Sequence, residues 1–337
     1  MPPGWRAEVF VVMLFCEPLF LFAFLPICLL VYHASPQRLR NLVLCGASLL
    51  FYAVGEWRFV PFLLASVALN YALARLIERW RGRRGGGALL ALGIISDLAL
   101  LFVFKYSAFF VQNFNVARVA LGSQPWPVPQ LALPLGLSFF TFHKISYKVD
   151  VYRGVAQARR SALDLCLYIL VFPQLIAGPI IRYHDIADQL RRRLTSLEDM
   201  AEGARRFTIG LGKKMLLANP AALCADQIFG TPGLVGLPST ELRGQVAWLA
   251  ACCYSLQIYF DFSGYSDMAI GLGRMFGFTF PENFAAPYQS TSVTDFWRRW
   301  HISLSRWFRD YLYIPLGGNR AAPWRVYANL ATVFVLC

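Results

Sequence analysis

The chain has 337 residues, of which 57% are hydrophobic and 15% are charged, and its formal net charge is +13. Soluble domains are usually about 45–50% apolar and about 25% charged, so this composition excludes an ordinary soluble protein. It predicts an all-α, polytopic membrane protein with a single helical domain over 1–337. Cytoplasmic loops of membrane proteins are rich in Lys and Arg, which accounts for the positive charge. No basic stretch alternates with aromatic residues, so nucleic acid is not an expected partner.

Cysteine and histidine follow neither a disulfide nor a metal pattern. Most of the eight Cys lie inside apolar runs and none forms CxxC, so we expect small buried side chains. The four His lack HExxH and every other metal-ligand spacing. The sequence therefore predicts no metal site and no bound cofactor.

The first third of the chain contains four apolar segments. They are expected as spanning helices at about 14–32, 41–55, 59–77 and 88–111. No small-residue cleavage site follows the first segment, so it is interpreted as a spanning helix rather than a signal peptide. Residues 1–12, before Met13, are interpreted as an upstream choice of start codon. Basic loops follow the first and third segments, and the positive-inside rule places these loops in the cytoplasm and the N-terminus in the periplasm.

Beyond residue 130 the apolar segments can no longer be assigned as helices that each cross the membrane once. The segments 131–150 and 164–181 are apolar but contain charged residues or internal Pro and Gly. If both crossed the membrane, the basic, amphipathic stretch 191–214 would lie outside, so we expect one of them to be re-entrant and 191–214 to be cytoplasmic or interfacial. Residues 245–276 are expected to form one or two helices. No internal repeat is visible, which disfavours a solute transporter.

Several ionisable residues interrupt the apolar segments. Asp97 is interpreted as a buried polar contact, and Asp261 and Asp267 as helix-packing residues or partners of Arg. His143 is expected to be a satisfied core or interface residue, and His184 a loop residue.

The stretch "TDFWRRWHISLSRWFRDYLYIPLGG" (294–318) contains three Trp, four Arg, two Asp and one His in a chain that is otherwise mostly apolar. It is expected as one helix, with Ser292 and Asp295 forming a capping box and Pro315 near its end. One stripe of this helix is predicted to hold Phe296, Trp300, Ser303, Trp307 and Tyr311. His301 would lie beside the stripe, next to Ser305. From the residues alone two interpretations stay open: an interfacial anchor with a hydrogen-bonded His, or a polar cavity in which His301 transfers protons.

The charges of this stretch are spaced for ion pairs along a helix. Asp295 is expected to pair with Arg298 or Arg299, and Arg306 with Asp310.

The last segment, "WRVYANLATVFVLC", becomes apolar near Val326. Eleven or so helical residues reach only about half of a ~30 Å hydrocarbon core. The sequence is therefore expected to be a C-terminally incomplete version of a longer chain.

The stretch 255–320, from "SLQIYFDFSGYSDMAIGLG" through "TDFWRRWHISLSRWFRDYLYIPLGGNR", closely resembles the membrane-bound O-acyltransferase family. "LPLGLSFFTFHKISYKVDVYRG" and "FPQLIAGPIIRYHDI" resemble the bacterial branch that O-acetylates alginate and related exopolysaccharides. The resemblance extends over essentially the whole chain from Met13.

The resemblance implies a helical enzyme of the bacterial inner membrane with re-entrant segments around a central polar tunnel. An acyl group from a cytoplasmic thioester donor such as acetyl-CoA would pass to a hydroxyl of a polysaccharide on the periplasmic side, with periplasmic acetylation proteins as partners. His301 matches the first polar position of the family motif and is the expected catalytic residue. The expected supporting residues are Asp295, Arg298, Trp300, Ser305, Arg309 and Asp310.

The family's other histidine lies in a following apolar helix, in a context like "GLWHG", and none of the four His here matches it. Our hypothesis is that the histidine after residue 337 is the base, while His301 positions the carbonyl or shares the proton. The alternatives are an acyl or D-alanyl relay to another cell-envelope acceptor, and a non-catalytic channel or scaffold for polymer export.

Overall fold

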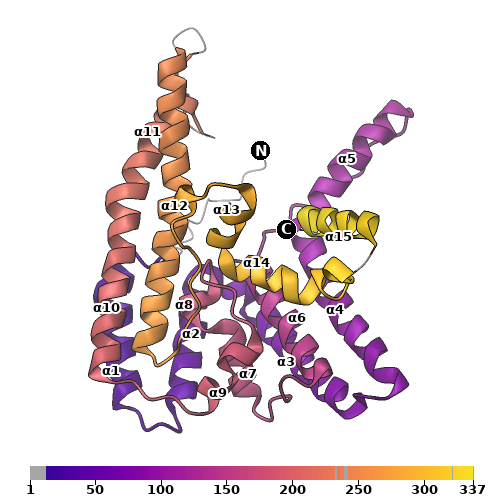
Figure 1. Cartoon of the computed structure of the whole chain (residues 1–337), viewed down its shortest axis with the longest axis vertical. Helices are drawn as coiled ribbons and strands as arrows, with labels where there is room; N and C mark the ends of the chain where they lie inside the picture. Colours follow the sequence, from indigo (N-terminus) through magenta and orange to yellow (C-terminus); the bar gives the residue numbers. More distant parts are fainter. Residues whose placement is uncertain (1–12, 232–233, 239–241, 321, 337) are drawn as a thin grey trace.

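The computed structural model describes residues 13–231, 234–238, 242–320 and 322–336; the interpretation of 1–12 as a start-codon artefact lies outside these residues. The described part is helical and contains no β-strand, as the composition predicts. Figure 1 shows a long helical hairpin along one side, the N-terminal helices along the base and the other side, and the C-terminal helices across the middle.

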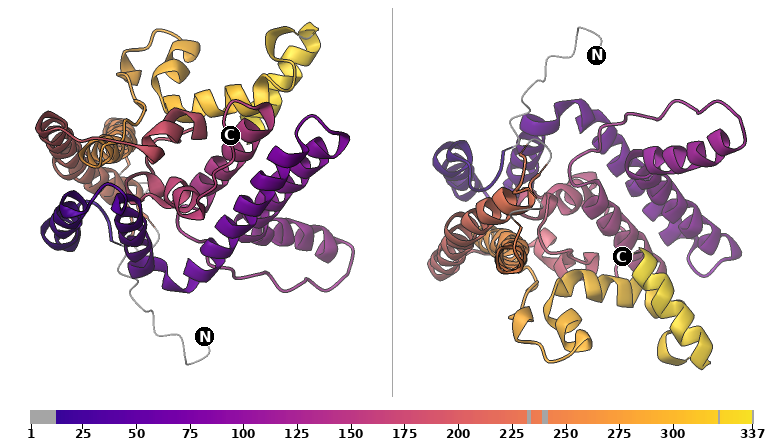
Figure 2. Two further views of the ribbon diagram at one scale, coloured as in Figure 1. Left: turned by 90° about the horizontal axis from the view of Figure 1, so that it is seen from below. Right: turned by 90° about the horizontal axis from the view of Figure 1, so that it is seen from above.

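The N-terminal part forms the expected helices with shifted bounds. The elements are η1 (Phe20–Phe24), α1 (Leu25–Ala34), α2 (Arg40–Glu56), η2 (Trp57–Phe59), α3 (Val60–Trp80), α4 (Arg84–Lys105) and α5 (Ser107–Ala120). The segment predicted at 88–111 is two helices, because the chain bends at Tyr106 and α5 departs from α4 (Figure 2). Residues 40–80 and 84–105 are long and apolar enough to cross a membrane, with mean hydropathies of 1.7 and 2.3.

A helical hairpin forms the opposite side of the molecule. One arm runs through α10 (Leu197–Gly212), η3 (Lys213–Ala218) and α11 (Asn219–Phe229), and the other is α12 (Gly244–Met275). The sequence predicts a separate interfacial stretch over 191–214, whereas α10 packs along α12 as the start of a long arm. The region 245–276 is one helix, as one of the two expected alternatives.

Small residues allow the two arms to touch. A Cβ on Gly210 would lie 2.5 Å from the carbonyl oxygen of Gly264, and one on Gly203 would lie 2.7 Å from that of Gly271. Backbones approach this closely in membrane proteins only where the side chains are small. Glycines spaced seven residues apart on each arm therefore set the contact line of the hairpin.

Charged pairs complete the contact between the arms. Asp267 accepts hydrogen bonds from Arg206 (2.8 Å) and Lys213 (2.6 Å), and Asp261 accepts one from Lys214 (2.6 Å). Asp267 is a partner of Arg and Asp261 a partner of Lys, and both aspartates join the two packed arms, which confirms the expected helix-packing role.

Helix α6 (Leu137–Arg153) lies in the centre of the fold and is buried along nearly its whole length. Its Lys144 and Lys148 share one carboxylate, that of Asp97 on α4: Lys144 Nζ lies 3.2 Å from Oδ1, and Lys148 Nζ donates to Oδ2. Ser66 and Asn70 on α3 accept one further bond from each ammonium, at 2.9 and 2.6 Å. All these side chains are buried, so the expectation of a buried polar contact at Asp97 is confirmed. The cluster joins α3, α4 and α6.

Two further expectations about isolated residues need correction. His143 on α6 is fully buried, and its Nε2 accepts a 3.4 Å bond from the backbone N–H of Ile181, but its Nδ1 has no partner. It is therefore only half satisfied. Cys28, Cys45 and Cys166 are buried free thiols as expected, whereas Cys252 is exposed on α12.

The segment after α6 is short and broken. It contains α7 (Ala162–Leu170), α8 (Phe172–Leu175) and, after an extended stretch, α9 (Tyr183–Arg191). Asn41, at the start of α2, donates from Nδ2 both to Asp164 Oδ1 (2.7 Å) and to the carbonyl oxygen of Leu190 (2.9 Å). The beginning of α7 and the end of α9 therefore lie at the same end of the molecule.

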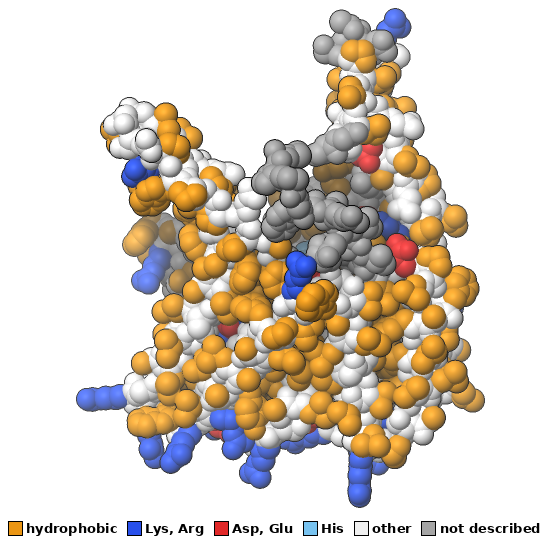
Figure 3. All heavy atoms as spheres, turned by 180° about the vertical axis from the view of Figure 1, so that it is seen from behind, with side chains coloured by type: hydrophobic (Ala, Val, Ile, Leu, Met, Phe, Trp, Pro, Cys, Tyr) orange, Lys and Arg blue, Asp and Glu red, His pale blue; other side chains and the backbone are white. Residues whose placement is uncertain are grey.

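That end carries the basic loops and is called the basic end here. It comprises the turns 35–39, 80–83, 154–161 and 192–196. Two hydrogen bonds place the second and third of these turns side by side: Arg81 donates to the carbonyl oxygen of Val151 (3.4 Å), and Glu78 accepts from the N–H of Ala158 (2.8 Å). Figure 3 shows Lys and Arg side chains gathered along this edge below a largely hydrophobic surface. The exposed arginines are Arg38, Arg79, Arg81, Arg83, Arg84, Arg153, Arg160, Arg191 and Arg192.

The C-terminal part contradicts one prediction. The stretch expected as a single helix is divided into α13 (Val293–Arg299), α14 (Ile302–Phe308) and η5 (Arg309–Tyr313), with η6 (Gly318–Arg320) and α15 (Pro323–Leu336) after it. Trp300 and His301 lie in the break between α13 and α14, so the predicted stripe is divided into two faces. Half of the expected capping box is confirmed: the side chain of Ser292 accepts from the N–H of Asp295, whereas the carboxylate of Asp295 pairs with Arg299.

Candidate active site

His301 occupies the break between α13 and α14 in a left-handed conformation, with φ of 45°. This conformation is uncommon for a residue with a side chain and is maintained only where the surroundings impose it. The preceding loop supplies the constraint: the N–H of Ala285 donates to the carbonyl oxygen of Arg299 (2.9 Å), and the N–H of Ile302 donates to that of Asn283 (3.0 Å). The loop therefore clamps both sides of His301.

The buried side chain of Asn283 organises the site. Its Oδ1 accepts from the backbone N–H of Ser303 (3.3 Å) and from Ser303 Oγ (2.8 Å), and Nδ2 donates to Ser266 Oγ on α12 (3.0 Å). Asn283 thus satisfies an N–H in the first turn of α14, which no intrahelical carbonyl can reach. Ser303 Oγ in turn accepts from the N–H of Ile180 (2.9 Å), which connects α14 to the extended stretch before α9.

This arrangement fixes the tautomer of His301. Its Nδ1 lies 3.0 Å from Asn283 Oδ1. The atom facing Ser303 must be the oxygen of the amide, because a backbone N–H can only donate. Nδ1 of a neutral His301 therefore carries the proton, and Nε2 is left with a free lone pair. His301 is oriented as a proton acceptor at Nε2.

Aromatic rings surround the imidazole. The ring of Phe262 on α12 meets it edge to face, with centroids 4.7 Å apart and planes at 87°. Beside it Trp300 stacks on Phe296 at 5.5 Å and meets Phe284 edge to face at 5.1 Å. These contacts restrict the imidazole and limit the water around it.

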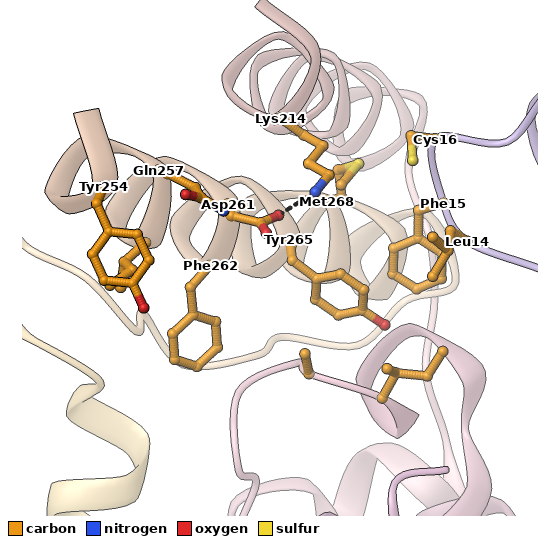
Figure 4. A pocket seen from close by; sticks show the side chains of 13 residues that line it. Leu14, Phe15, Cys16, Lys214, Tyr254, Gln257, Asp261, Phe262, Tyr265 and Met268 are labelled. Carbon is orange, nitrogen blue, oxygen red and sulfur yellow. Dashed lines mark hydrogen bonds and ion pairs between the residues drawn. The ribbon is translucent and has the colours of Figure 1, made fainter. Parts of the chain in front are cut away.

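On the other side of Phe262 lies a cavity of about 480 Å³, which is bounded by α12, by residues 14–16 and by residues 176–177. Figure 4 shows Phe262, Tyr254 and Tyr265 pointing into it from α12, with the ion pair of Asp261 and Lys214 at its edge. Phe262 lines the cavity and also contacts His301, so the two features are neighbours. The lining is mostly apolar with one ion pair, which suits a small acyl group near a polar contact.

The supporting residues predicted from sequence divide between two places. Asp295 pairs with Arg299 (2.9 Å), as one of the expected alternatives, and Ser305 Oγ donates to the carbonyl oxygen of Trp297 (3.3 Å). Ser305 also donates its backbone N–H to the carbonyl oxygen of His301 (3.1 Å), and Trp300 precedes His301 in the break, while Arg298 is exposed on α13.

Arg309 and Asp310 belong to a second network nearer the basic end. Asp310 accepts from Arg182 (2.6 Å) and Arg309 (2.7 Å), so the predicted pairing with Arg306 is wrong. In the π-helical turn η5 the side chain of Asp310 faces the extended stretch before α9 instead of α14.

A buried carboxylate extends this second network. Asp150 on α6 accepts from Tyr311 at Oδ1 (2.8 Å), and its Oδ2 lies 2.8 Å from His184 Nδ1. The hydrogen bond that His184 donates to the carboxylate of Asp150 raises the pKa of His184 above its ordinary value, against the opposing effect of partial burial. His184 lies in the first turn of α9, not in a loop as the sequence suggests.

Sequence reasoning did not find Asn283, Phe262 or the pairing of Asp150 with His184. Asn283 lies in the loop "FPENFAAP", whose sequence does not indicate that this side chain is buried. Within the described residues no three His, Cys, Asp or Glu side chains are grouped so that they could hold a metal ion.

Comparison with known proteins identifies several relatives. The chain is 46% identical to the probable alginate O-acetylase AlgI of Pseudomonas syringae pv. tomato and 38% identical to the peptidoglycan O-acetyltransferase of Helicobacter pylori, over 96% of its own length in both cases. It is also 30% identical to the teichoic acid D-alanyltransferase of Bacillus subtilis, over 53% of this chain and 45% of that protein.

The chain spans 61% of the first of these relatives and 66% of the second. The model of the membrane-bound O-acyltransferase family matches residues 101–336, which include α6, α12 and His301. The chain belongs to the membrane-bound O-acyltransferase family and is an integral membrane protein.

Proposed function

We propose that the full-length protein is a bacterial membrane O-acetyltransferase that moves an acetyl group from a cytoplasmic thioester, such as acetyl-CoA, toward hydroxyls of an exopolysaccharide such as alginate. The observation that carries the proposal is His301, whose Nδ1 proton is fixed by Asn283, whose Nε2 keeps its lone pair, and whose neighbour Phe262 lines an apolar cavity. Acyl transfer to a hydroxyl needs such an acceptor, because the hydroxyl must lose its proton as it attacks the thioester carbonyl.

In this proposal His301 shares the proton, because the lone pair at Nε2 of the neutral imidazole cannot donate a hydrogen bond to the carbonyl. A second histidine implied by the family resemblance is the base. The apolar lining of the cavity excludes water, which would otherwise hydrolyse the thioester. The ion pair of Lys214 and Asp261 provides a charged contact at the cavity edge. The donor is a substrate and no bound cofactor is required.

We infer that the basic end faces the cytoplasm of the bacterial inner membrane, because arginine-rich loops are retained there, and that the N-terminus is periplasmic. The segment 162–191 would then be re-entrant. Its support is that Asn41 bonds both ends of the segment, and that α7, with nine residues, is about 14 Å long, far less than a bilayer core. A central polar tunnel would connect the donor side with the periplasmic side.

The position of Ser266 along α12 supports a tunnel between the two sides of the membrane. Ser266, which bonds Asn283, lies nine residues before the end of α12, or about 14 Å along the helix from the basic end. His301 would therefore lie near the middle of the membrane, where an acyl group is passed from one side to the other. Periplasmic acetylation proteins would complete delivery to the polymer.

A second candidate is favoured by the similarity to the D-alanyltransferase of Bacillus subtilis, whose acceptor by its name is teichoic acid. The same site would then relay another acyl group to a different envelope polymer. A non-catalytic channel or scaffold for polymer export is the remaining alternative.

The test is His301→Ala in the full-length protein, with the acetyl content of the secreted polymer measured at equal membrane abundance. We expect acetylation to fall by at least about a hundredfold, while polymer yield is maintained. Unchanged acetylation would exclude a direct role for His301, and a parallel loss of polymer and acetyl would favour the scaffold.

A further inference from the structure

A second pocket, unrelated to the one beside His301, lies at the basic end. It has a volume of about 240 Å³ and is bounded by α9 and by the turn after α6. The residues that give it chemical character are Arg159, Tyr183, His184, Asp188 and Arg191. Three of these can carry a positive charge and one is acidic, so the pocket is cationic at neutral pH. Its lining residue Arg191 is one of the exposed arginines of the basic end.

The inner wall contains an incompletely satisfied cation. Arg159 is 6% exposed, and its Nε has no hydrogen-bond partner. Its Nη2 donates to the carbonyl oxygen of Ala187, and Nη1 lies 4.0 Å from Asp164 Oδ2, at the limit of an ion pair. A buried guanidinium usually has acceptors for its N–H groups, since each unmet donor costs about 1–3 kcal/mol. The structure therefore contains a buried cation that lacks one acceptor beside a polar pocket.

The outer wall of the pocket adds an exposed positive charge, that of Arg191. Arg191 is exposed at the end of α9, and its guanidinium makes no hydrogen bond or ion pair within the described residues. His184 is held by Asp150 (2.8 Å) and lies 3.4 Å from Asp185, so its charge is largely compensated. Asp188 is the one carboxylate on the lining, and it opposes an anion less than the two arginines attract one.

We propose that this pocket binds a phosphate ester, and that the ester is the nucleotide end of the thioester donor. Guanidinium groups bind phosphate through paired, charge-assisted hydrogen bonds, and the pocket offers one buried and one exposed guanidinium. The pocket is connected to the catalytic segment, because His184 and Tyr311 bind opposite oxygens of Asp150, and Tyr311 follows α14 by three residues. The assignment of the ester to the thioester donor rests on the proposed function. The proposal that the pocket binds phosphate does not depend on that function.

The test measures binding, so it does not depend on turnover. Purified full-length protein in nanodiscs of neutral phosphatidylcholine is titrated with CoA and, separately, with pantetheine, which lacks phosphate. The variants are Arg191→Gln, which removes a guanidinium without breaking a hydrogen bond or ion pair of the described residues, and Arg192→Gln, an exposed neighbour outside the pocket, as the matched control. Thermal unfolding verifies that both variants fold.

We expect Arg191→Gln to weaken CoA binding about five- to tenfold, with Arg192→Gln within about twofold and pantetheine binding unchanged in both. Inorganic phosphate should displace CoA from the wild type and less effectively from Arg191→Gln. Equal losses in the two variants would show diffuse attraction to the basic end and would overturn the proposal, as would CoA binding that no variant alters.

A further arm separates the donor from a lipid headgroup. If nanodiscs containing phosphatidylglycerol abolish CoA binding to the wild type, and Arg191→Gln removes this inhibition, the pocket binds a lipid phosphate and the assignment to the donor is wrong. Acetyl transfer by the wild type alongside unaltered CoA binding in Arg191→Gln would refute the pocket and leave the proposed function intact. Phosphate binding that depends on Arg191 without any acetyl transfer would refute the proposed function alone.

Discussion

The substitution Asn283→Ala removes the amide that fixes His301 without altering the histidine. In the wild type Asn283 Oδ1 accepts from His301 Nδ1 at 3.0 Å and from both polar groups of Ser303, and Nδ2 donates to Ser266. The alanine variant leaves the imidazole free to exchange tautomers and leaves the N–H of Ser303 without its acceptor. We therefore expect losses in both stability and activity.

The magnitudes follow from these contacts. Each buried donor left unsatisfied costs about 1–3 kcal/mol, and two such donors, with partial rescue by water, give about 2–4 kcal/mol of destabilisation. Loss of the group that orients a catalytic side chain typically reduces activity about 10- to 100-fold. The measurements are thermal unfolding in detergent and acetyl content of the polymer, at equal abundance of the full-length protein in the membrane.

Two matched variants separate orientation from packing. Ser266→Ala removes only the bond on the far side of the amide and should retain activity within about twofold. Asn283→Asp keeps an oxygen facing His301 and Ser303, so it should retain more activity than Asn283→Ala even if it is equally destabilised. If Asn283→Ala acetylates normally, or if Ser266→Ala is equally impaired, the orientation of His301 by Asn283 is not what the site requires.

Three further predictions concern the scaffold. The carboxylate of Asp150 raises the pKa of His184 above its ordinary value of about 6.5, so the stability that the charged imidazole contributes is fully present below about pH 6.5 and is lost as the pH rises through the folded-state pKa. The melting temperature of His184→Gln should therefore approach that of the wild type as the pH is raised from 5.5 to 8.5. A difference in melting temperature that stays constant over this range would contradict the prediction. Asp97→Asn leaves two buried ammonium groups without a counter-charge and should destabilise the protein by about 3–5 kcal/mol, whereas Lys148→Met leaves a balanced pair and should cost less; the reverse order by thermal unfolding would refute the shared-carboxylate arrangement. A Cβ on Gly210 would lie 2.5 Å from backbone, whereas a Cβ on Gly212 would meet open space. Gly210→Leu should therefore reduce the yield of folded protein on size-exclusion chromatography, and the control Gly212→Leu should not. Equal yields from the two variants would exclude close packing of the two arms.

Apolar patterning was sufficient to locate the helices whose boundaries are local. The segments predicted at 41–55 and 59–77 appear as α2 at 40–56 and α3 at 60–80, because long apolar runs between basic or polar turns define both ends. The conflict between the basic stretch after residue 190 and a simple count of crossings also had a local cause. It predicted that either 131–150 or 164–181 is re-entrant, without choosing between them. The structure shows that the second of these regions is divided into α7, α8 and α9, and that Asn41 bonds both ends of it.

The break at His301 could not be predicted, because its cause is not local. The stretch 294–318 has a cap, a periodic aromatic stripe and suitable ion-pair spacings, all of which are compatible with one uninterrupted helix. The backbone N–H of Ala285 bonds Arg299 before the break, and the backbone carbonyl of Asn283, 18 residues before His301, bonds Ile302 after it. These two bonds make the left-handed residue possible. The pairing of Asp97 with Lys148 spans 51 residues and is equally invisible to periodicity.

The most direct test of the proposed acyl transfer is acceptor-dependent consumption of the thioester. Purified full-length protein is incorporated into liposomes with acetyl-CoA on the side of the basic end and de-acetylated polymer, with its periplasmic partners, on the other, and free CoA thiol is measured with time. Our account predicts thiol release that requires the acceptor and is lost in His301→Ala. Thiol release that is independent of the acceptor, or none in a preparation that still exports polymer, would contradict it.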